Sequence, residues 1–385
     1  MNREQNLKAP VTRNHNTLLK YLTIAIYILC LSICPLARSS SKQTQLSKSP
    51  RIDISVDPRV ELIAIVFRLA GNPEYNDGTL RPYVKAIERH FGDFDNHPVI
   101  KMAAELRYKR SMSCDGPMSL AVHINRDFRL RKTSDQWPST LDSRWEKEET
   151  ADFLEKIRQF AAETKFDEFF KAQSDIYGAG MRSCKDLMTP LNLGDWLSGF
   201  FGVKDYGDLK LVLGFVNGFS NYGPRFKSDR IAEKYAIVGM RPFDAANIVI
   251  FRPSQIGTTV HEFCHSFANP IVEKYMGQLR PAGEKLFAAN SPAMRMRGYQ
   301  KWESLMYETA VRACVMSFVR QKFETMYLDY FLDDEVKAGF VWIEDAGNFL
   351  KNYENNRDKY PTFESFFPEF VTFLNEYTQK VALEH

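Results

Sequence analysis

Apolar residues recur at the 3.6-residue spacing of an α-helix along much of this chain. Asp57 and Pro58 fit the start of one such segment, because aspartate caps a helix and proline suits its first turn, and Gly71 fits its end. Further helices are predicted at residues 80–91, 98–110, 147–164 and 297–322, and the C-terminal third from residue 297 onward is mainly helical.

Strand patterns are fewer and shorter. Residues 194–202 (GDWLSGFFG) indicate an aromatic turn cluster that packs into the core. Strands are predicted at residues 120–124, 209–216, 235–240 and 247–252. A small number of strands among many helices predicts an α+β fold with a small mixed sheet.

The clearest helical pattern follows the last predicted strand. Ser254 and Gly257 lie where this helix should start, and Asn269 followed by Pro270 should end it. Its apolar residues form one continuous stripe that consists of Ile256, Val260, Phe263, Cys264 and Phe267. At about 100° per residue, the two histidines of this segment share a face that lies away from the stripe.

The sequence His261-Glu262-Phe263-Cys264-His265 places these two imidazoles one helical turn apart, so both can reach one ion. Zinc suits two neutral histidines, with nitrogen–metal distances of about 2.0–2.1 Å. Glu262 lies near the same edge, where it can take a proton from water. The alternative is a buried helix whose histidines bond only to backbone or carboxylate groups. The accompanying glutamate and the helical context favour the metal site.

A catalytic zinc site needs three protein ligands and an open position. A metzincin would continue with glycine and histidine where Ala268 and Ile271 stand, so that class is excluded. The other common solution is a glutamate from a second helix, which completes a His₂Glu set.

The predicted helix at residues 297–322 offers two carboxylates, Glu303 and Glu308. Glu308 has mainly apolar neighbours, where a carboxylate is costly unless it is paired or bound to a cation. Glu303 has a more polar setting, so Glu308 is the preferred ligand. Arg312, one turn further on, can orient Glu308 by contacting its carboxylate. A simple Glu308–Arg312 ion pair is the alternative.

The segment HEFCHSF, followed at residues 307–313 by YETAVRA, resembles the gluzincin class of zinc metallopeptidases. The opening VDPRVELIAIVFRLAGNPEY, together with HEFCHSFANP, is similar to an uncharacterised family of secreted bacterial HExxH proteins classed as a domain of unknown function. The resemblance implies that His261, His265 and Glu308 bind one Zn²⁺ per chain and that Glu262 is the catalytic base. Gluzincins also commonly use a tyrosine or histidine to stabilise the oxyanion. Tyr222 in SNYGPRF is a candidate, and a packed or turn-capping tyrosine is the alternative.

The same resemblance implies a helix-rich, zincin-like fold. The small mixed sheet would lie above the HExxH helix, and the C-terminal part would be mainly helical. An exposed edge strand would align an extended peptide by backbone pairing.

Charge and length bound the remaining possibilities. Acidic and basic residues are interspersed and the net charge is only +3, so nothing points to nucleic acid.

Residues 1–20 are basic and residues 21–37 are apolar, which predicts an export signal or membrane anchor over residues 1–39. A polar linker over residues 40–55 and a domain over residues 56–385 would follow. Residues 56–205 would form its helical N-terminal part and residues 206–385 its zinc-site core. The domain would then function outside the cytoplasm.

The four cysteines beyond the leader permit two disulfides, although the connectivity is open. Cys264 and Cys314 fall on the expected core faces of the two zinc helices, where buried free thiols are the default. The remaining two are Cys114 and Cys184.

These features predict zinc-dependent hydrolysis of peptide bonds. No G-x-S-x-G element supports serine hydrolysis. Two alternatives stay open: a non-catalytic surface or binding protein with a structural zinc, and a metal-dependent hydrolase of a non-peptide amide. The oligomeric state is open.

Overall fold

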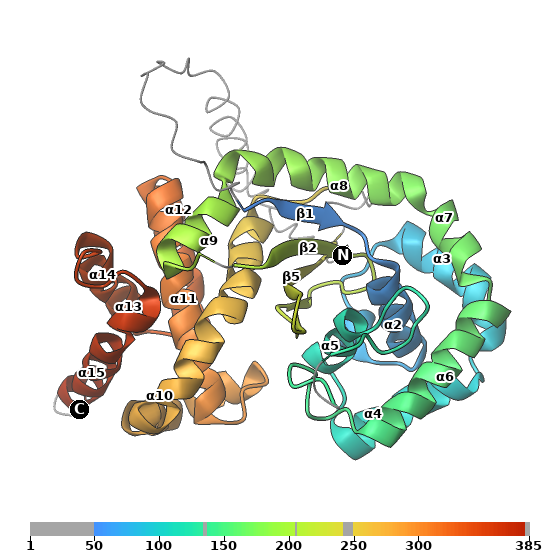
Figure 1. Cartoon of the computed structure of the whole chain (residues 1–385), viewed down its shortest axis with the longest axis horizontal. Coiled ribbons are helices and arrows are strands. Elements are labelled where there is room, and N and C mark those ends of the chain that lie inside the picture. The colour runs from blue at the N-terminus through green and yellow to red at the C-terminus, as the bar shows by residue number, and fades with distance from the viewer. Residues whose placement is uncertain (1–49, 134–136, 205, 242–248, 382–385) are drawn as a thin grey trace, which may run out of the picture. The chain divides into compact units, whose positions relative to one another are not determined.

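A five-stranded mixed sheet organises the fold in the computed structural model, which describes residues 50–133, 137–204, 206–241 and 249–381 (Figure 1). Its parallel strands are β1 (Ile52–Ser55), β2 (Asp208–Gly214) and β5 (Ala232–Gly239). The antiparallel partners of β5 are β3 (Asn221–Tyr222) and β4 (Arg225–Lys227). Because β3 follows β5 in the order β1-β2-β5-β3, β3 and β4 lie at the edge of the sheet.

Four of the helices before β2 match predicted ranges. The side chain of Asp57 caps the first of them by accepting a hydrogen bond from the backbone N–H of Arg59 at 2.9 Å. The predictions at residues 58–71, 80–91, 98–110 and 147–164 are confirmed. The helices are α2 (Pro58–Leu69), α3 (Arg81–Phe91), α4 (Pro98–Arg110), α5 (Asp115–His123), α6 (Lys147–Glu163), α7 (Phe166–Ala172), α8 (Ser174–Met188) and α9 (Leu193–Phe201). Short 3₁₀ turns occur at η2 (Pro73–Tyr75), η3 (Gly92–Phe94) and η4 (Thr189–Leu191).

The chain after β5 is helical, as predicted, and the α+β class is confirmed. Helices α10 and α11 lie side by side, and Figure 1 shows α12 to α15 beyond them. The helices are α10 (Ser254–Met296), α11 (Trp302–Lys322), α12 (Thr325–Lys337), α13 (Ile343–Phe349), α14 (Lys351–Asn355) and α15 (Phe363–Val381).

Three local predictions are wrong. Residues 120–123 belong to helix α5, because a short helix buried on every side has the same continuous apolar run as a buried strand. Residues 194–201 form α9 rather than a turn cluster, and Gly202 ends this helix with φ 69°. Within the prediction at residues 247–252, Val249 lies in a β-bridge, residues 250–252 form no strand, and residues 247–248 lie outside the described residues.

Helix α10 does not end at Pro270, where the sequence predicted a stop, but continues to Met296. A proline inside a helix removes one backbone hydrogen bond, so the segment must be held by other contacts. Ile271 and Val272, directly after Pro270, are buried, and α10 packs along α11 and α15. Tertiary burial therefore outweighs the local break. Helix α11 begins at Trp302 rather than at residue 297.

The start of the described chain also differs from expectation. Residues 52–55, expected to be linker, form β1 and pair with β2. The predicted leader over residues 1–39 lies outside the described residues. Among the helices between residues 50 and 381, none combines the length and hydrophobicity needed to span a bilayer.

The two faces of the sheet carry different helices. On β5, Lys234 lies over the ring of Phe267 from α10, whereas the hydroxyl of Tyr235 meets Arg59 of α2. Neighbouring strand residues point to opposite faces, so even-numbered residues of β5 face α10 and odd-numbered ones face α2. The predicted apolar stripe of α10 is buried, with Ile256 and Phe263 inaccessible to solvent. The HExxH segment is thereby held beneath the sheet.

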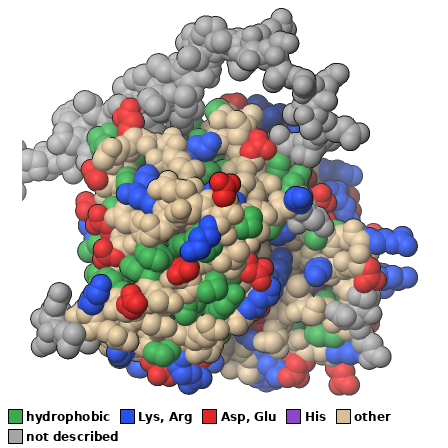
Figure 2. All heavy atoms as spheres, turned by 60° about the vertical axis from the view of Figure 1, so that its left-hand side comes forward, with side chains coloured by type: hydrophobic (Ala, Val, Ile, Leu, Met, Phe, Trp, Pro, Cys, Tyr) green, Lys and Arg blue, Asp and Glu red, His purple; other side chains and the backbone are tan. Residues whose placement is uncertain are grey.

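The structure also shows the state of the cysteines and the distribution of charged side chains on one face. All four cysteines of the described chain are free, so the two possible disulfides do not form. Cys264 and Cys314 are buried as predicted, Cys184 is buried, and Cys114 is exposed. Figure 2 shows acidic and basic side chains interspersed over the face that carries the C-terminal helices.

Candidate metal centre

Three predicted ligands from α10 and α11 meet at one point. The Nε2 atoms of His261 and His265 are 3.1 Å apart. Glu308 Oε2 lies 3.4 Å from Nε2 of His261, and its Oε1 lies 3.5 Å from Nε2 of His265. The side chains are 18, 17 and 11% exposed, respectively. This group is partly buried and still open to solvent.

These separations suit a single metal ion. Ligand bonds of about 2.0–2.1 Å in a tetrahedron place neighbouring donor atoms about 3.3 Å apart. The separation of the two Nε2 atoms and the shortest approach of Glu308 to each histidine, which its two oxygens make separately, lie within a few tenths of an ångström of that value. With one donor atom taken from each residue, the three atoms fall within 4.8 Å of one another. Two imidazoles and one carboxylate could therefore hold a metal ion, and a fourth position would remain for solvent.

Burial and mutual charge set the protonation of the three groups. Burial lowers the pKa of His261 to about 3, so its imidazole is neutral. Burial also acts to lower the pKa of His265, but the contact with Glu308 and its charge raise it to about 9. Burial alone would raise the pKa of Glu308, yet the two neighbouring imidazoles of His261 and His265 and the charge of Arg312 hold it well below its usual range. A divalent cation would compete with the proton that His265 shares with Glu308.

Glu262 lies between the two histidines in the sequence, and its side chain is buried. Burial raises its pKa to about 7, and the charges of Glu308 and Asp115 act in the same direction. Gly223, at the edge of the sheet, lies so close to Glu262 that a methyl group at this position would collide with the backbone carbonyl of Glu262. The link between β3 and β4 therefore lies directly against the HExxH turn.

Arg312 supports the third ligand, as the sequence predicted, but within a larger group. Its guanidinium donates to Glu308 Oε2 at 3.0–3.1 Å and to Glu335 Oε2 at 2.6 Å. It also donates to the hydroxyl of Tyr299 at 3.4 Å and lies over the ring of Phe340. A carboxylate held this way keeps a fixed orientation toward the histidines.

Sequence reasoning missed three members of this centre. Asn269, at the predicted stop of the helix, places its Oδ1 3.2 Å from Nδ1 of His265. This contact leaves Nε2 free for a metal, and the i+4 spacing could have indicated it. Glu335 and Tyr299 come from α12 and from the turn before α11, and no local pattern links them to the HExxH helix.

Two other candidates lie apart from the three ligands. Glu303 is half-exposed and is not part of the His–His–Glu group. Tyr222 pairs with Ile237, an odd-numbered residue of β5, so its side chain points to the face away from α10. Its pKa is raised by burial, and the groups that also affect it are Ser220, Cys114, Glu74 and Tyr75. The structure does not bring Tyr222 to the metal ligands.

Fold and site together define an α+β protein with a His–His–Glu group on two adjacent helices that could hold a metal ion. The chain belongs to the family described as Domain of unknown function (DUF4932), which matches residues 52–373. No curated protein and no solved structure matches the chain significantly.

Proposed function

We propose that this protein is a zinc-dependent peptidase of the gluzincin type that acts outside the cytoplasm. The observation that carries the proposal is the convergence of donor atoms of His261, His265 and Glu308 within 4.8 Å of one another, with Glu262 next to His261 in the chain. A purely structural zinc site is normally closed by four protein ligands and has no use for a neighbouring carboxylate. Three ligands with a glutamate at the open side favour catalysis.

Each residue has a definite task in this proposal. When bound, zinc supplies a Lewis acid that polarises the substrate carbonyl and lowers the pKa of water to about 7. Glu262 accepts the proton of the attacking water and returns it to the leaving amine. Arg312 keeps Glu308 ionised and oriented, and Asn269 does the same for the ring of His265.

The edge of the sheet offers a place for an extended peptide. Among the described residues, β3 and β4 are the last strands on their side of the sheet, and Gly223 between them lies against Glu262. A peptide that pairs with this edge by backbone hydrogen bonds passes close to the catalytic glutamate. The edge strand that the family resemblance implies would then be β3–β4.

Tyr299 replaces Tyr222 as the proposed partner of the oxyanion. Its hydroxyl lies beside Arg312, and both burial and the charge of Glu308 raise its pKa, so it remains a neutral donor. Changing Tyr299 to Phe should lower kcat by about 10²-fold or more with zinc retained. Tyr222→Phe is the matched control. A larger loss in the control would return the role to Tyr222.

The decisive experiment separates metal binding from turnover. Purified protein should contain about one zinc per chain by elemental analysis and should cleave members of a diverse peptide mixture. Glu262→Gln should keep the zinc and lower turnover by about 10³-fold. Glu308→Ala should lose zinc, whereas Glu303→Ala should keep it. Full turnover by the Glu262→Gln protein would refute the general-base role.

The same peptide assay separates the alternatives. Zinc retained with no chelator-sensitive cleavage of any peptide would favour a structural metal. Cleavage of a non-peptide amide alone would favour the other class of hydrolase.

A further inference from the structure

Strands β3 and β4 continue each other along β5, because their residue pairs keep one register on that strand. Between them, the carbonyl of Pro224 accepts a hydrogen bond from the N–H of Tyr235 at 3.0 Å. In an antiparallel ladder the bonded residues alternate, so Gly223 and Arg225 turn their backbone N–H and C=O groups away from β5. Within the described part of the chain, this is the outer edge of the sheet. A substrate peptide would pair with these groups.

The side chain of Arg225 points to the face of the sheet that carries α10. Arg225 pairs directly with Lys234, and side chains that are directly opposite each other share a face. Lys234 lies over the ring of Phe267 on α10. The charge of Arg225 also reaches the hydroxyl of Tyr307, which directly precedes the predicted ligand Glu308 on α11. The guanidinium therefore lies on the side of the sheet where the three predicted ligands meet.

Arg225 is half-buried, and its side chain makes no ion pair or hydrogen bond with any residue that the structure describes. Its partner across the strands is Lys234, and like charges directly opposite each other are destabilising. Burial raises the pKa of Tyr307, the contact with Glu273 and the charge of Glu303 add to this rise, and the charge of Arg225 opposes it. Two carboxylates are thus in the neighbourhood, but neither forms an ion pair with Arg225.

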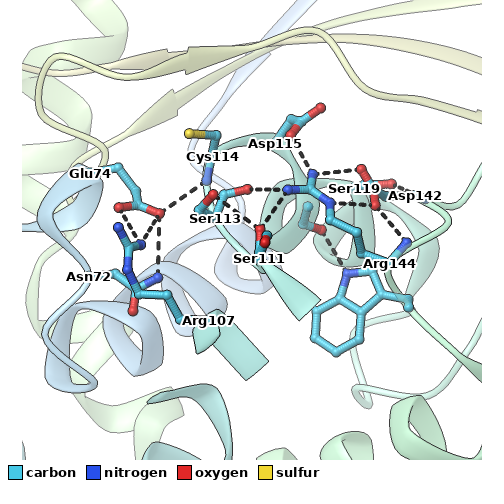
Figure 3. A network of polar contacts seen from close by, with 12 residues as sticks. Asn72, Glu74, Arg107, Ser111, Ser113, Cys114, Asp115, Ser119, Asp142 and Arg144 are labelled. Carbon is cyan, nitrogen blue, oxygen red and sulfur yellow. Dashed lines mark hydrogen bonds and ion pairs between the residues drawn. The ribbon is translucent and has the colours of Figure 1, made fainter. Parts of the chain in front are cut away.

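Figure 3 shows the contrasting arrangement in a network of polar side chains at the start of α5. There, Arg107 pairs with Glu74 at 2.9 Å, and Arg144 pairs with two carboxylates at 2.6 and 2.7 Å. These arginines hold parts of the fold together. Arg225 has no such contact, and a half-buried guanidinium without a counter-ion favours a carboxylate that comes from outside the chain.

We propose that Arg225 anchors a subsite that binds a carboxylate of the peptide substrate. This inference rests on the proposed peptidase function. A peptide residue that pairs with the outer side of Arg225 places its side chain on the same face of the sheet, with the two Cβ atoms about 4.5–5.5 Å apart. The guanidinium can then donate two parallel hydrogen bonds to the carboxylate. The carboxylate is either the side chain of aspartate or glutamate or the free carboxyl terminus.

The first test compares peptides that share one sequence and carry glutamate or glutamine at successive positions near the cleaved bond. With the zinc-loaded protein, glutamate at the position opposite Arg225 should raise kcat/KM by about tenfold. Arg225→Gln should remove this preference with zinc content unchanged, whereas Arg89→Gln, at an exposed site on α3, should keep it. A preference that survives in the Arg225→Gln protein would overturn the inference.

Amidation of the carboxyl terminus separates the two sources of the carboxylate. If the subsite binds the terminus, amidation should lower kcat/KM by about tenfold and the exchange of glutamate for glutamine should have little effect. If it binds an acidic side chain, the two results should be reversed. An equal rate for all of these peptides would overturn the inference.

The second test needs no turnover. Zinc-loaded Glu262→Gln protein should bind a dye-labelled peptide with glutamate at the preferred position, as measured by fluorescence anisotropy, and adding Arg225→Gln should raise Kd by about tenfold. Arg225→Lys, which keeps the charge but loses the two parallel bonds, should give a smaller change. The melting temperature of Arg225→Gln should stay level or rise, because the change relieves the repulsion with Lys234. A marked fall would show that Arg225 supports the fold instead and would overturn the inference.

The two proposals fail separately. Zinc-dependent cleavage with no preference for a carboxylate would overturn the subsite and leave the peptidase intact. A zinc-loaded protein that cleaves none of these peptides, with or without a carboxylate, would overturn the peptidase proposal itself.

Discussion

Replacing Glu61 with glutamine tests the most deeply buried carboxylate of the fold. Glu61 on α2 is inaccessible to solvent; its Oε1 accepts the N–H of Phe215 at 2.7 Å, and its Oε2 accepts the hydroxyl of Tyr83 at 2.6 Å. Burial raises its pKa from 4.5 to about 7 despite these two hydrogen bonds. The folded protein therefore binds this proton more tightly than the unfolded chain does.

The sign and size of the effect follow from linkage. Between pH 4.5 and about 7 the folded state holds more protons than the unfolded state, so stability falls as pH rises. The rise in pKa of about 2.5 units corresponds to a destabilisation of the folded state by about 3 kcal/mol. This destabilisation is absent below pH 4.5, where the carboxyl is protonated in both states, and is complete above pH 7. Glutamine keeps an acceptor for Phe215 and places an N–H group toward Tyr83, so it resembles the protonated acid.

Denaturant unfolding followed by tryptophan fluorescence at pH 5 and pH 8 measures this difference. The Glu61→Gln protein should have nearly wild-type stability at pH 5 and exceed the wild type by roughly 2–3 kcal/mol at pH 8. Glu155→Gln, which removes an exposed carboxylate from α6, controls for the change in net charge. An equal stability difference at both pH values would refute the reasoning.

Further predictions concern the support of the metal centre. Gly223→Ala should lower both turnover and melting temperature, because the added methyl group collides with the carbonyl of Glu262. Gly257→Ala on α10, where a methyl group meets open space, should instead raise stability by about 0.5–1 kcal/mol, as measured by thermal unfolding. Arg312→Ala should destabilise by about 3–5 kcal/mol, because it leaves Glu335 buried without its partner. It should also weaken zinc binding by about 10–100-fold in a chelator competition; unchanged affinity would contradict its orienting role.

Local patterns were sufficient to find the HExxH helix and most of its neighbours. His261 and His265 share a face because the helical repeat places residues four apart on one side, and this holds whatever the helix packs against. The caps and apolar spacing of α2, α3 and α4 are local in the same sense, so their bounds were predicted within one or two residues. The sequence indicated Glu308 as the third ligand because a carboxylate among apolar neighbours needs a compensating charge.

What the tertiary structure decided involves partners distant in sequence. Pro270 stays within α10 because burial against α11 and α15 replaces the lost backbone bond. Residues 52–55 become a strand because β2, more than 150 residues later, offers its edge. The register of β3 on β5 turns Tyr222 away from the metal ligands, and the packing of α11 brings Tyr299 toward them. Side-chain periodicity is a property of each element alone, whereas the meeting of two elements depends on the packing of the whole core.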